Sequence, residues 1–264
     1  MELNNNTILI TGGTSGLGLE FATQLMALGN TVIITGRDQA KLDETKLKLP
    51  QIHTFKSDVS DPEAIMNLYN QVVNRFPELN ILVNNAGEMR KLDLHDKSLD
   101  LNNITHEIEI NLSGPVRMVQ QFLPHLQTKN NAAIMNVTSG IAFVPFPLAP
   151  IYGATKSGLQ SYTRSLRVQL KKDGIKVFEL VAPGAKTPLN DKFLDDVDPK
   201  MLMEPGKLVT AAIKGMKKDK YQIFPGIASL LALLSRLAPS FIFNQMSKIA
   251  EKSLDRNNGI AVSI

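Results

Sequence analysis

The sequence predicts an α/β protein with a doubly wound, parallel, seven-stranded sheet and helices on both faces. Short apolar runs alternate with longer stretches of helical spacing along most of the 264 residues, as successive βαβ units require. The connections are long enough to cross between parallel strands, which hairpin loops are not. No internal repeat or low-complexity segment interrupts the series. We therefore expect one domain over residues 1–264.

The strands are expected where apolar runs are short and end in turn residues. The first, TILIT at 7–11, leads directly into glycines and is typical of a strand buried on both faces. The second, at 31–35, is closed by Gly36-Arg37. The full set, in chain order, is 7–11, 31–35, 52–55, 81–83, 132–137, 176–181 and 221–224.

The helices between these strands carry recognisable end signals. Leu17–Leu28 has helical spacing and is followed by Gly29, a favourable C-cap residue. Asp38 can cap the next helix, which runs to about Leu47. Asp61-Pro62 opens the third helix with an N-cap and a first-turn proline.

Three longer segments complete the expected helices. Asn103–Leu126 predicts one continuous helix despite Pro115, and Tyr152–Lys171 predicts another. The most apolar stretch covers about 227–250, where we favour a helix pair that covers a cleft or contacts another subunit. The alternative is a helix lying on a membrane surface. We do not expect membrane association.

Composition excludes several classes of protein. The chain has no cysteine, which excludes disulfides, cysteine-ligated metals and a thiol nucleophile. Its four histidines lie far apart, so we expect no metal site and no Ser-His-Asp mechanism. The 29 basic and 25 acidic residues give a net charge of +4, and the basic residues are too dispersed to predict nucleic-acid binding. With a polar N-terminus and no apolar run of about 18 residues, a cytoplasmic protein is expected.

A glycine-rich turn, TGGTSGLG at 11–18, joins the first strand to the first helix. Glycine permits the tight turn, the approach of a pyrophosphate and the packing of helix on strand. The helix N-terminus supplies free N–H groups and a positive dipole end. The alternative is a loop that only turns the chain, but the position after the first strand favours a Rossmann-type dinucleotide site. Its expected cofactor residues are Gly12, Thr14, Ser15, Gly16, Leu17 and Gly18.

Arg37 suggests which dinucleotide binds. NAD sites place a carboxylate after the second strand, whereas NADP sites prefer a cation there. Gly36-Arg37 therefore favours NADP(H), with NAD(H) still possible, unless Arg37 is an ordinary surface arginine. Asp58, followed by Val59, can contact the adenine or only shape the turn before Asp61.

Further motifs follow in order: NNAG at 84–87, Asn111 in EINLSG, Ser139 in NVTSG, YGATK at 152–156 and Pro183-Gly184. With the glycine turn, they resemble the short-chain dehydrogenase/reductase family of the single-domain type, over roughly residues 7–190. TILITGGTSGLGLE and VTSGIAFVP are similar to the bacterial DltE-type oxidoreductases. The resemblance implies an NAD(P)-dependent enzyme that acts on a carbonyl or alcohol.

Tyr152 and Lys156 lie four residues apart, on one face of the expected helix. An ammonium about 5 Å from a phenol lowers its pKa by about two units at an effective dielectric of ~20. That shift brings a tyrosine toward the range useful for acid–base catalysis. Taken alone, the pair is also what an ordinary amphipathic helix presents.

The resemblance assigns a role to each matching residue. Tyr152 exchanges a proton with the substrate oxygen, and Lys156 binds the nicotinamide ribose and lowers the Tyr152 pKa. Ser139 hydrogen-bonds the substrate oxygen, and Asn111 holds a water in a proton relay. The remaining cofactor residues implied are Asn84, Ala86, Gly87, Pro183, Gly184 and Thr187.

Two loops surround this site. Residues 141–151 are apolar and either line a pocket for a hydrophobic substrate or pack on the protein itself. Residues 185–206 resemble the family's variable substrate loop. The helices near Asn103 and Tyr152 resemble those that pair subunits, so a homodimer or homotetramer is expected. The competing functions are a dinucleotide sensor without turnover and a membrane-associated protein with this fold.

Overall fold

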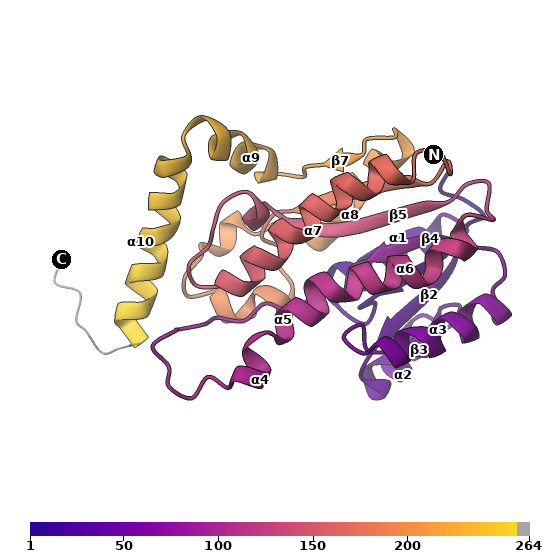
Figure 1. Ribbon diagram of the computed structural model, residues 1–264, viewed down its shortest axis with the longest axis horizontal. Helices are drawn as coiled ribbons and strands as arrows, with labels where there is room; N and C mark the ends of the chain where they lie inside the picture. Colours follow the sequence, from indigo (N-terminus) through magenta and orange to yellow (C-terminus); the bar gives the residue numbers. More distant parts are fainter. Residues whose placement is uncertain (258–264) are drawn as a thin grey trace.

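A computed structural model of the chain describes residues 1–257. All seven expected strands form, and they make one parallel sheet with the order β3-β2-β1-β4-β5-β6-β7 (Figure 1). The strands are β1 (Thr7–Thr11), β2 (Thr31–Gly36), β3 (His53–Lys56), β4 (Leu79–Asn84), β5 (Ala133–Ser139), β6 (Lys176–Ala182) and β7 (Gln222–Ile223). The chain builds outward from β1 to β3 and then adds β4 on the other side of β1. A ligand site is expected at such a reversal of strand order.

Helices cover both faces of the sheet because its strands are apolar on both sides. Ile8 and Ile10 of β1 pack in one buried cluster, whereas Leu9 between them packs in another. The first cluster includes side chains of α1 (Gly16–Ala27), α2 (Gln39–Lys48) and α8 (Pro205–Lys217). The second includes side chains of α3 (Pro62–Arg75), α6 (Gly114–Leu126) and α7 (Pro150–Gln169).

The expected helix ends are confirmed by hydrogen bonds. Asp38 accepts the N–H of Lys41 at 3.2 Å, and Asp61 accepts the N–H of Glu63 at 2.9 Å. Gly29 follows α1 with a φ of 81°, a conformation that side chains other than glycine rarely adopt. These residues fix the end of α1 and the starts of α2 and α3.

The expectation of one continuous helix over 103–126 is wrong. The segment contains α4 (Leu101–Ile104), α5 (His106–Ile108), a π-helical turn η1 (Glu109–Ser113) and then α6. Pro115 explains the change at the start of α6, because proline has no N–H and its ring crowds the carbonyl four residues earlier. The π turn absorbs this mismatch, and such turns often occur at functional sites.

The C-terminal third adds elements that the sequence only partly indicated. The substrate loop holds two short 3₁₀ turns, η3 (Pro188–Phe193) and η4 (Pro199–Met201), and a β-bridge between Ala185 and Met203 ties its ends together. The apolar segment folds as the expected helix pair, α9 (Ala228–Leu237) and α10 (Pro239–Asn257). Figure 1 shows this pair at one end of the molecule, beyond the N-terminal end of α7.

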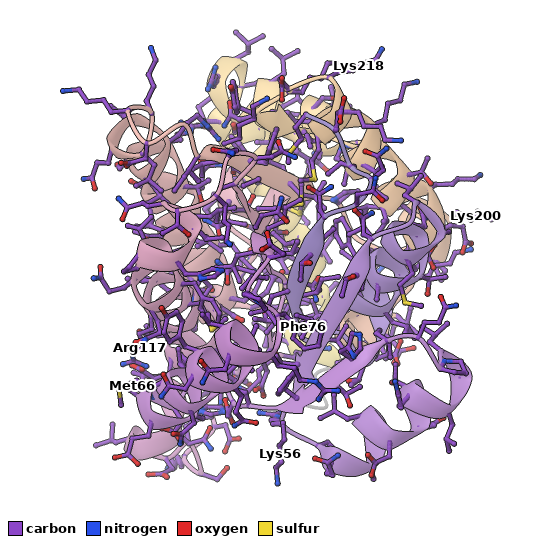
Figure 2. The ribbon with its side chains drawn as sticks, turned by 90° about the vertical axis from the view of Figure 1, so that its right-hand side faces the viewer. Lys56, Met66, Phe76, Arg117, Lys200 and Lys218 are labelled. Atoms are coloured by element: carbon purple, nitrogen blue, oxygen red, sulfur yellow. The ribbon has the colours of Figure 1, made fainter. Side chains whose placement is uncertain are left out.

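Charged side chains are distributed around the surface rather than gathered in one stripe. Lys56, Arg117, Lys200 and Lys218 lie at well-separated positions in Figure 2. Within residues 1–257, no helix is both long and apolar enough to cross a bilayer.

Candidate active site

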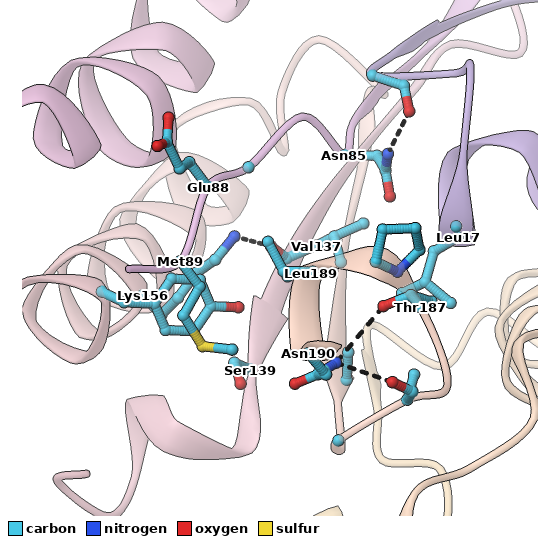
Figure 3. A pocket seen from close by; sticks show the side chains of 18 of the residues that line it. Leu17, Asn85, Glu88, Met89, Val137, Ser139, Lys156, Thr187, Leu189 and Asn190 are labelled. Atoms are coloured by element: carbon cyan, nitrogen blue, oxygen red, sulfur yellow. Dashed lines mark hydrogen bonds between the residues drawn. The ribbon is translucent and has the colours of Figure 1, made fainter. Parts of the chain in front are cut away.

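A cavity of about 650 Å³ opens at the carboxyl ends of the strands (Figure 3). Residues directly after β1, β2, β3 and β4 line one part of it, and the ends of β5 and β6 line another. The substrate loop and the α9–α10 pair complete the wall. The cavity therefore lies where the strand order reverses, as the fold predicts.

The glycine turn leaves no room for side chains at its key positions. Gly12 and Gly16 have φ values of 65° and 53°, which favour glycine. A Cβ on Gly12 would lie 2.8 Å from Cα of Ala86, and one on Gly18 would lie 2.1 Å from the carbonyl oxygen of Gly12. Ser15 is the N-cap of α1, and its hydroxyl makes no capping bond. The turn thus keeps the helix N-terminus open toward the cavity, as an anion site requires.

Asn85 holds this turn in place, a role that the sequence reasoning missed. Its side-chain nitrogen donates to the carbonyl oxygens of Thr11 and Gly12 at 3.0 and 3.1 Å, and Figure 3 draws one of these bonds. In return, the hydroxyl of Thr11 accepts the N–H groups of Asn85 and Ala86, both at 3.0 Å. These bonds join the ends of β1 and β4. The sequence offered only one signal for this role, the second Asn of NNAG, and its partner Thr11 lies 74 residues away.

Arg37 lines the cavity at the end of β2, and 62% of its side chain is exposed. Its guanidinium lies 3.9 Å from Oε2 of Glu88, an oxygen for which the described residues supply no hydrogen bond. His106 lies 3.8 Å from the same oxygen. Glu88 was not expected at the site. It places a carboxylate beside Arg37, the residue expected to favour NADP(H).

Asp58 and Val59 also line the cavity. One oxygen of Asp58 accepts the N–H and hydroxyl of Ser60 at 2.9 and 2.7 Å. Asp58 therefore shapes its turn and faces the cavity at the same time, so the two interpretations of this residue are compatible.

Ser139, Tyr152 and Lys156 meet where β5 ends against α7. Tyr152 and Lys156 are one helical turn apart and almost fully buried, with 5% and 4% of their surface exposed. Nζ of Lys156 lies 5.5 Å from the centre of the Tyr152 ring and donates to the carbonyl oxygen of Val137 at 2.9 Å (Figure 3). The structure thus brings together three residues that the sequence spreads over 18 positions.

Burial controls the protonation of this group. It raises the pKa of Tyr152 to about 12, although a hydrogen bond with Ser139 acts in the opposite direction. It also lowers the pKa of Lys156 to about 8. The net pKa of Tyr152 is therefore raised, because removing water from the phenolate has the largest effect on it; that Lys156 acts in the opposite direction stays a prediction.

Asn111 lies behind the cavity wall, in the π turn. Its amide accepts the N–H of Glu88 at 2.8 Å and donates to the Glu88 carbonyl at 2.7 Å. Its Oδ1 is also close to Gly87, where a Cβ would approach it to 3.2 Å, and Nζ of Lys156 would lie 3.7 Å from the same Cβ. Asn111 therefore fixes the strand-end segment that faces Lys156.

Three expected site residues do not line the cavity. Asn111 lies behind the wall, and Gly18 is buried beneath the glycine turn. Asn84 is buried between strands, where it donates to the side chain of Asn136 at 2.9 Å. Its role here is to brace β4 against β5. Every other expected residue lines the cavity, including Pro183, Gly184 and Thr187.

The part of the cavity beyond Tyr152 is apolar. Ile141 and Phe146 of the 141–151 loop line it, while Phe143 packs on Phe224 with ring centres 5.8 Å apart. Some residues of this loop therefore line the cavity, and others pack on the protein itself. The two segments expected to cover the cleft supply most of the other apolar lining, and Met89 is a lining residue that the sequence did not indicate; the side chains from those segments include Leu189, Phe193, Leu231, Met246 and Ile249.

An ion-pair cluster fastens the substrate loop over this end. The fully buried carboxylate of Asp196 binds Nζ of Lys91 at 2.8 Å and a guanidinium nitrogen of Arg256 at 2.7 Å. Lys91 follows β4, Asp196 belongs to the substrate loop and Arg256 to α10. The pairs lower the pKa of Asp196 even though burial acts in the opposite direction.

Comparison with known protein families gives a match to the model described as short chain dehydrogenase, over residues 6–198. A relative from Bacillus subtilis (strain 168), named "Uncharacterized oxidoreductase DltE", is 45% identical over 195 residues, which are 74% of this chain and 77% of that protein.

Two solved structures share the fold. A short chain dehydrogenase from Burkholderia cenocepacia J2315 in complex with NADP has a TM-score of 0.80, with 20% identity over 93% of this chain and 99% of that one. A short chain dehydrogenase/reductase from Burkholderia phymatum in complex with NAD also has a TM-score of 0.80, with 21% identity over 88% and 93%. The two structures hold different dinucleotides.

Proposed function

The chain belongs to the short-chain dehydrogenase family of NAD(P)-dependent oxidoreductases, and from that premise we propose that it transfers hydride between NADP(H) and a carbonyl or secondary alcohol of an apolar substrate. One observation carries the proposal. A buried Ser139–Tyr152–Lys156 group and an open glycine turn with Arg37 line the same cavity.

The glycine turn fits a dinucleotide because its backbone stays bare. The N–H groups at the start of α1 and the hydroxyl of Ser15 would bind the pyrophosphate. Arg37 would bind the 2′-phosphate of NADP(H) through its guanidinium fork. Bound there, NADP(H) supplies or accepts the hydride.

Tyr152 would act as the proton donor to the substrate oxygen. With a pKa raised to about 12, its phenol carries a proton at neutral pH, as a donor to a carbonyl must. Ser139, the hydrogen-bond partner of Tyr152, would orient the same substrate oxygen. In the oxidation direction, the Lys156 ammonium would stabilise the phenolate once it forms.

Lys156 would also bind the nicotinamide ribose. Its ammonium is fixed by the Val137 carbonyl and keeps further N–H groups for a ribose hydroxyl. Asn111 positions the Glu88 backbone beside it, and a proton relay through water at Asn111 stays part of this proposal.

The lining beyond Tyr152 supports an apolar substrate. Phe146, Phe193 and Leu231 face the cavity next to the group that would perform the chemistry. Ligand sites of this kind bury most of the ligand against apolar walls and use few polar groups for orientation. We therefore propose aldehydes or ketones with extended hydrocarbon parts as the substrate class.

The test compares Tyr152→Phe with Tyr162→Phe, a second tyrosine on α7 that does not line the cavity. Single-turnover oxidation of NADPH is followed with a panel of long-chain aldehydes and ketones, and NADPH binding is checked by fluorescence. Tyr152→Phe should bind NADPH normally and transfer hydride at least about a hundredfold more slowly. Tyr162→Phe should match the wild type. Wild-type rates in Tyr152→Phe would show that another group donates the proton.

A further inference from the structure

The α9–α10 pair exposes a concentrated set of large apolar side chains. Thirteen large apolar side chains of residues 1–257 are exposed, and five of them fall within 14 consecutive residues of this pair. Leu237 and Phe241, on either side of the bend between the helices, are 74% and 58% exposed. We call this set the apolar tip; it consists of Leu230, Leu233, Leu237, Phe241 and Phe243.

The same two helices form part of the cavity wall. Ile227 and Leu231 of the α9 region and Met246 and Ile249 of α10 line it. Leu231 packs against Gly140, where a Cβ would approach it to 3.0 Å, so it lies beside Ser139. The same two helices therefore line the cavity with one set of side chains and expose the apolar tip with another.

The helix pair carries only basic side chains up to Ala250, because residues 227–250 contain no acidic residue. Its two cations in this stretch, Arg236 and Lys248, are both exposed. Soluble proteins rarely expose an apolar patch of this kind without a binding role, and the cations identify a negatively charged partner.

We infer that the apolar tip docks on an anionic lipid bilayer, with Leu and Phe side chains in the acyl region and Arg236 and Lys248 among the headgroups. A second copy of this chain is a poorer partner, because a two-fold contact through the tip would bring like charges together. This inference departs from the expectation drawn from the sequence. The sequence analysis treated covering the cleft and lying on a membrane as alternatives for this segment. In the structure, different side chains of the same helix pair can do both.

Docking in this way would place the cavity wall at the bilayer surface. An apolar carbonyl compound dissolved in the membrane would then reach the cavity past α9 without crossing water. This goes beyond the proposed function, because vesicle binding requires no turnover. A failure to bind vesicles would leave the proposed reaction untouched.

The experiment measures cosedimentation of the full chain with two kinds of vesicle. One contains phosphatidylcholine alone, and the other contains phosphatidylcholine with about one third phosphatidylglycerol, which gives it a negative surface potential. Binding should be stronger to the anionic vesicles by about tenfold or more, since each cation near such a surface contributes roughly fivefold. Raising the salt concentration should remove most of this difference.

Two matched double variants locate the contact. Leu237→Ser with Phe241→Ser should weaken vesicle binding at least about tenfold, because each side chain loses its transfer into the acyl region. Leu47→Ser with Met66→Ser changes two exposed apolar residues on α2 and α3 and should bind like the wild type. Circular dichroism checks that each variant folds.

Three results would overturn the inference. The first is absence of cosedimentation with anionic vesicles, and the second is equal binding by both double variants. The third is a larger wild-type oligomer that the Leu237→Ser, Phe241→Ser variant dissociates, because a second copy would then cover the apolar tip.

Discussion

Replacing Lys156 by methionine should make the protein more stable in the absence of nucleotide while removing its activity. Lys156 holds an ammonium group in the interior, beside Tyr152, with the Val137 carbonyl as its hydrogen-bond partner. Methionine has a similar length and no charge. The variant therefore removes the cost of burying the charge and keeps most of the packing.

The magnitude follows from the pKa. Burial lowers the Lys156 pKa from 10.5 to about 8, and this difference corresponds to roughly 3 kcal/mol of lost stability at neutral pH. The variant also loses the hydrogen bond to Val137, which offsets about 1–2 kcal/mol. The net expectation at pH 7 is a gain of about 1–2 kcal/mol, or about 3–6 °C in melting temperature for a chain of this size.

The advantage of the variant should disappear at high pH. Between pH 8 and 10.5 the unfolded lysine still binds its proton, whereas the folded one has released it. The wild type therefore gains stability as the pH rises through this window. The variant has no such group, so near pH 10 it should be no more stable than the wild type.

Urea unfolding followed by circular dichroism, at pH 7 and pH 10 without added nucleotide, measures both quantities. Lys172→Met, which changes an exposed lysine after α7, is the matched control and should change little at either pH. The reasoning is refuted if Lys156→Met is less stable than the wild type at pH 7, or if the difference between the two proteins does not depend on pH.

Three further predictions concern the cofactor, the substrate loop and assembly. Arg37→Ala should weaken NADPH binding about ten- to a hundredfold and leave NADH binding nearly unchanged in fluorescence titrations, whereas Glu88→Gln should tighten NADPH binding a few-fold; equal NADPH affinity in all three proteins would exclude Arg37 as the selecting residue. Asp196→Asn should cost about 1–3 kcal/mol in urea unfolding at pH 7 and raise KM more than it lowers kcat, because the substrate loop loses its attachment to Lys91 and Arg256. The low Asp196 pKa means that the carboxylate stabilises the wild type at neutral pH and loses this effect in acid, so equal acid sensitivity of variant and wild type would contradict its role. Light scattering should give the mass of a dimer or tetramer, and a monomer at micromolar concentration would contradict the expected assembly.

Features that depend on a few neighbouring residues were predictable from the sequence. The glycine turn is one, because positive φ at Gly12 and Gly16 is a local backbone requirement. The spacing of Tyr152 and Lys156 is another, since a four-residue separation on a helix places both on one face. The Asp38 and Asp61 caps are also local. Apolar runs alone predicted all seven strands.

The tertiary structure alone decided the features that depend on distant partners. Asn84 and Asn85 are adjacent, yet one braces β5 and the other holds the glycine turn, because strand alternation sends their side chains to different neighbours. The role of Asp196 could not be predicted, because its partners Lys91 and Arg256 lie 105 and 60 residues away in the sequence.

The protonation of Tyr152 belongs to the same group of features. Sequence spacing indicates that an ammonium is nearby, but it carries no measure of how much water remains around the phenol. The packing of β5, α7 and the substrate loop removes that water and raises the pKa to about 12. Local sequence thus determined that Tyr152 and Lys156 meet on one helix face, and long-range burial determined their pKa values, because desolvation depends on the whole surrounding fold.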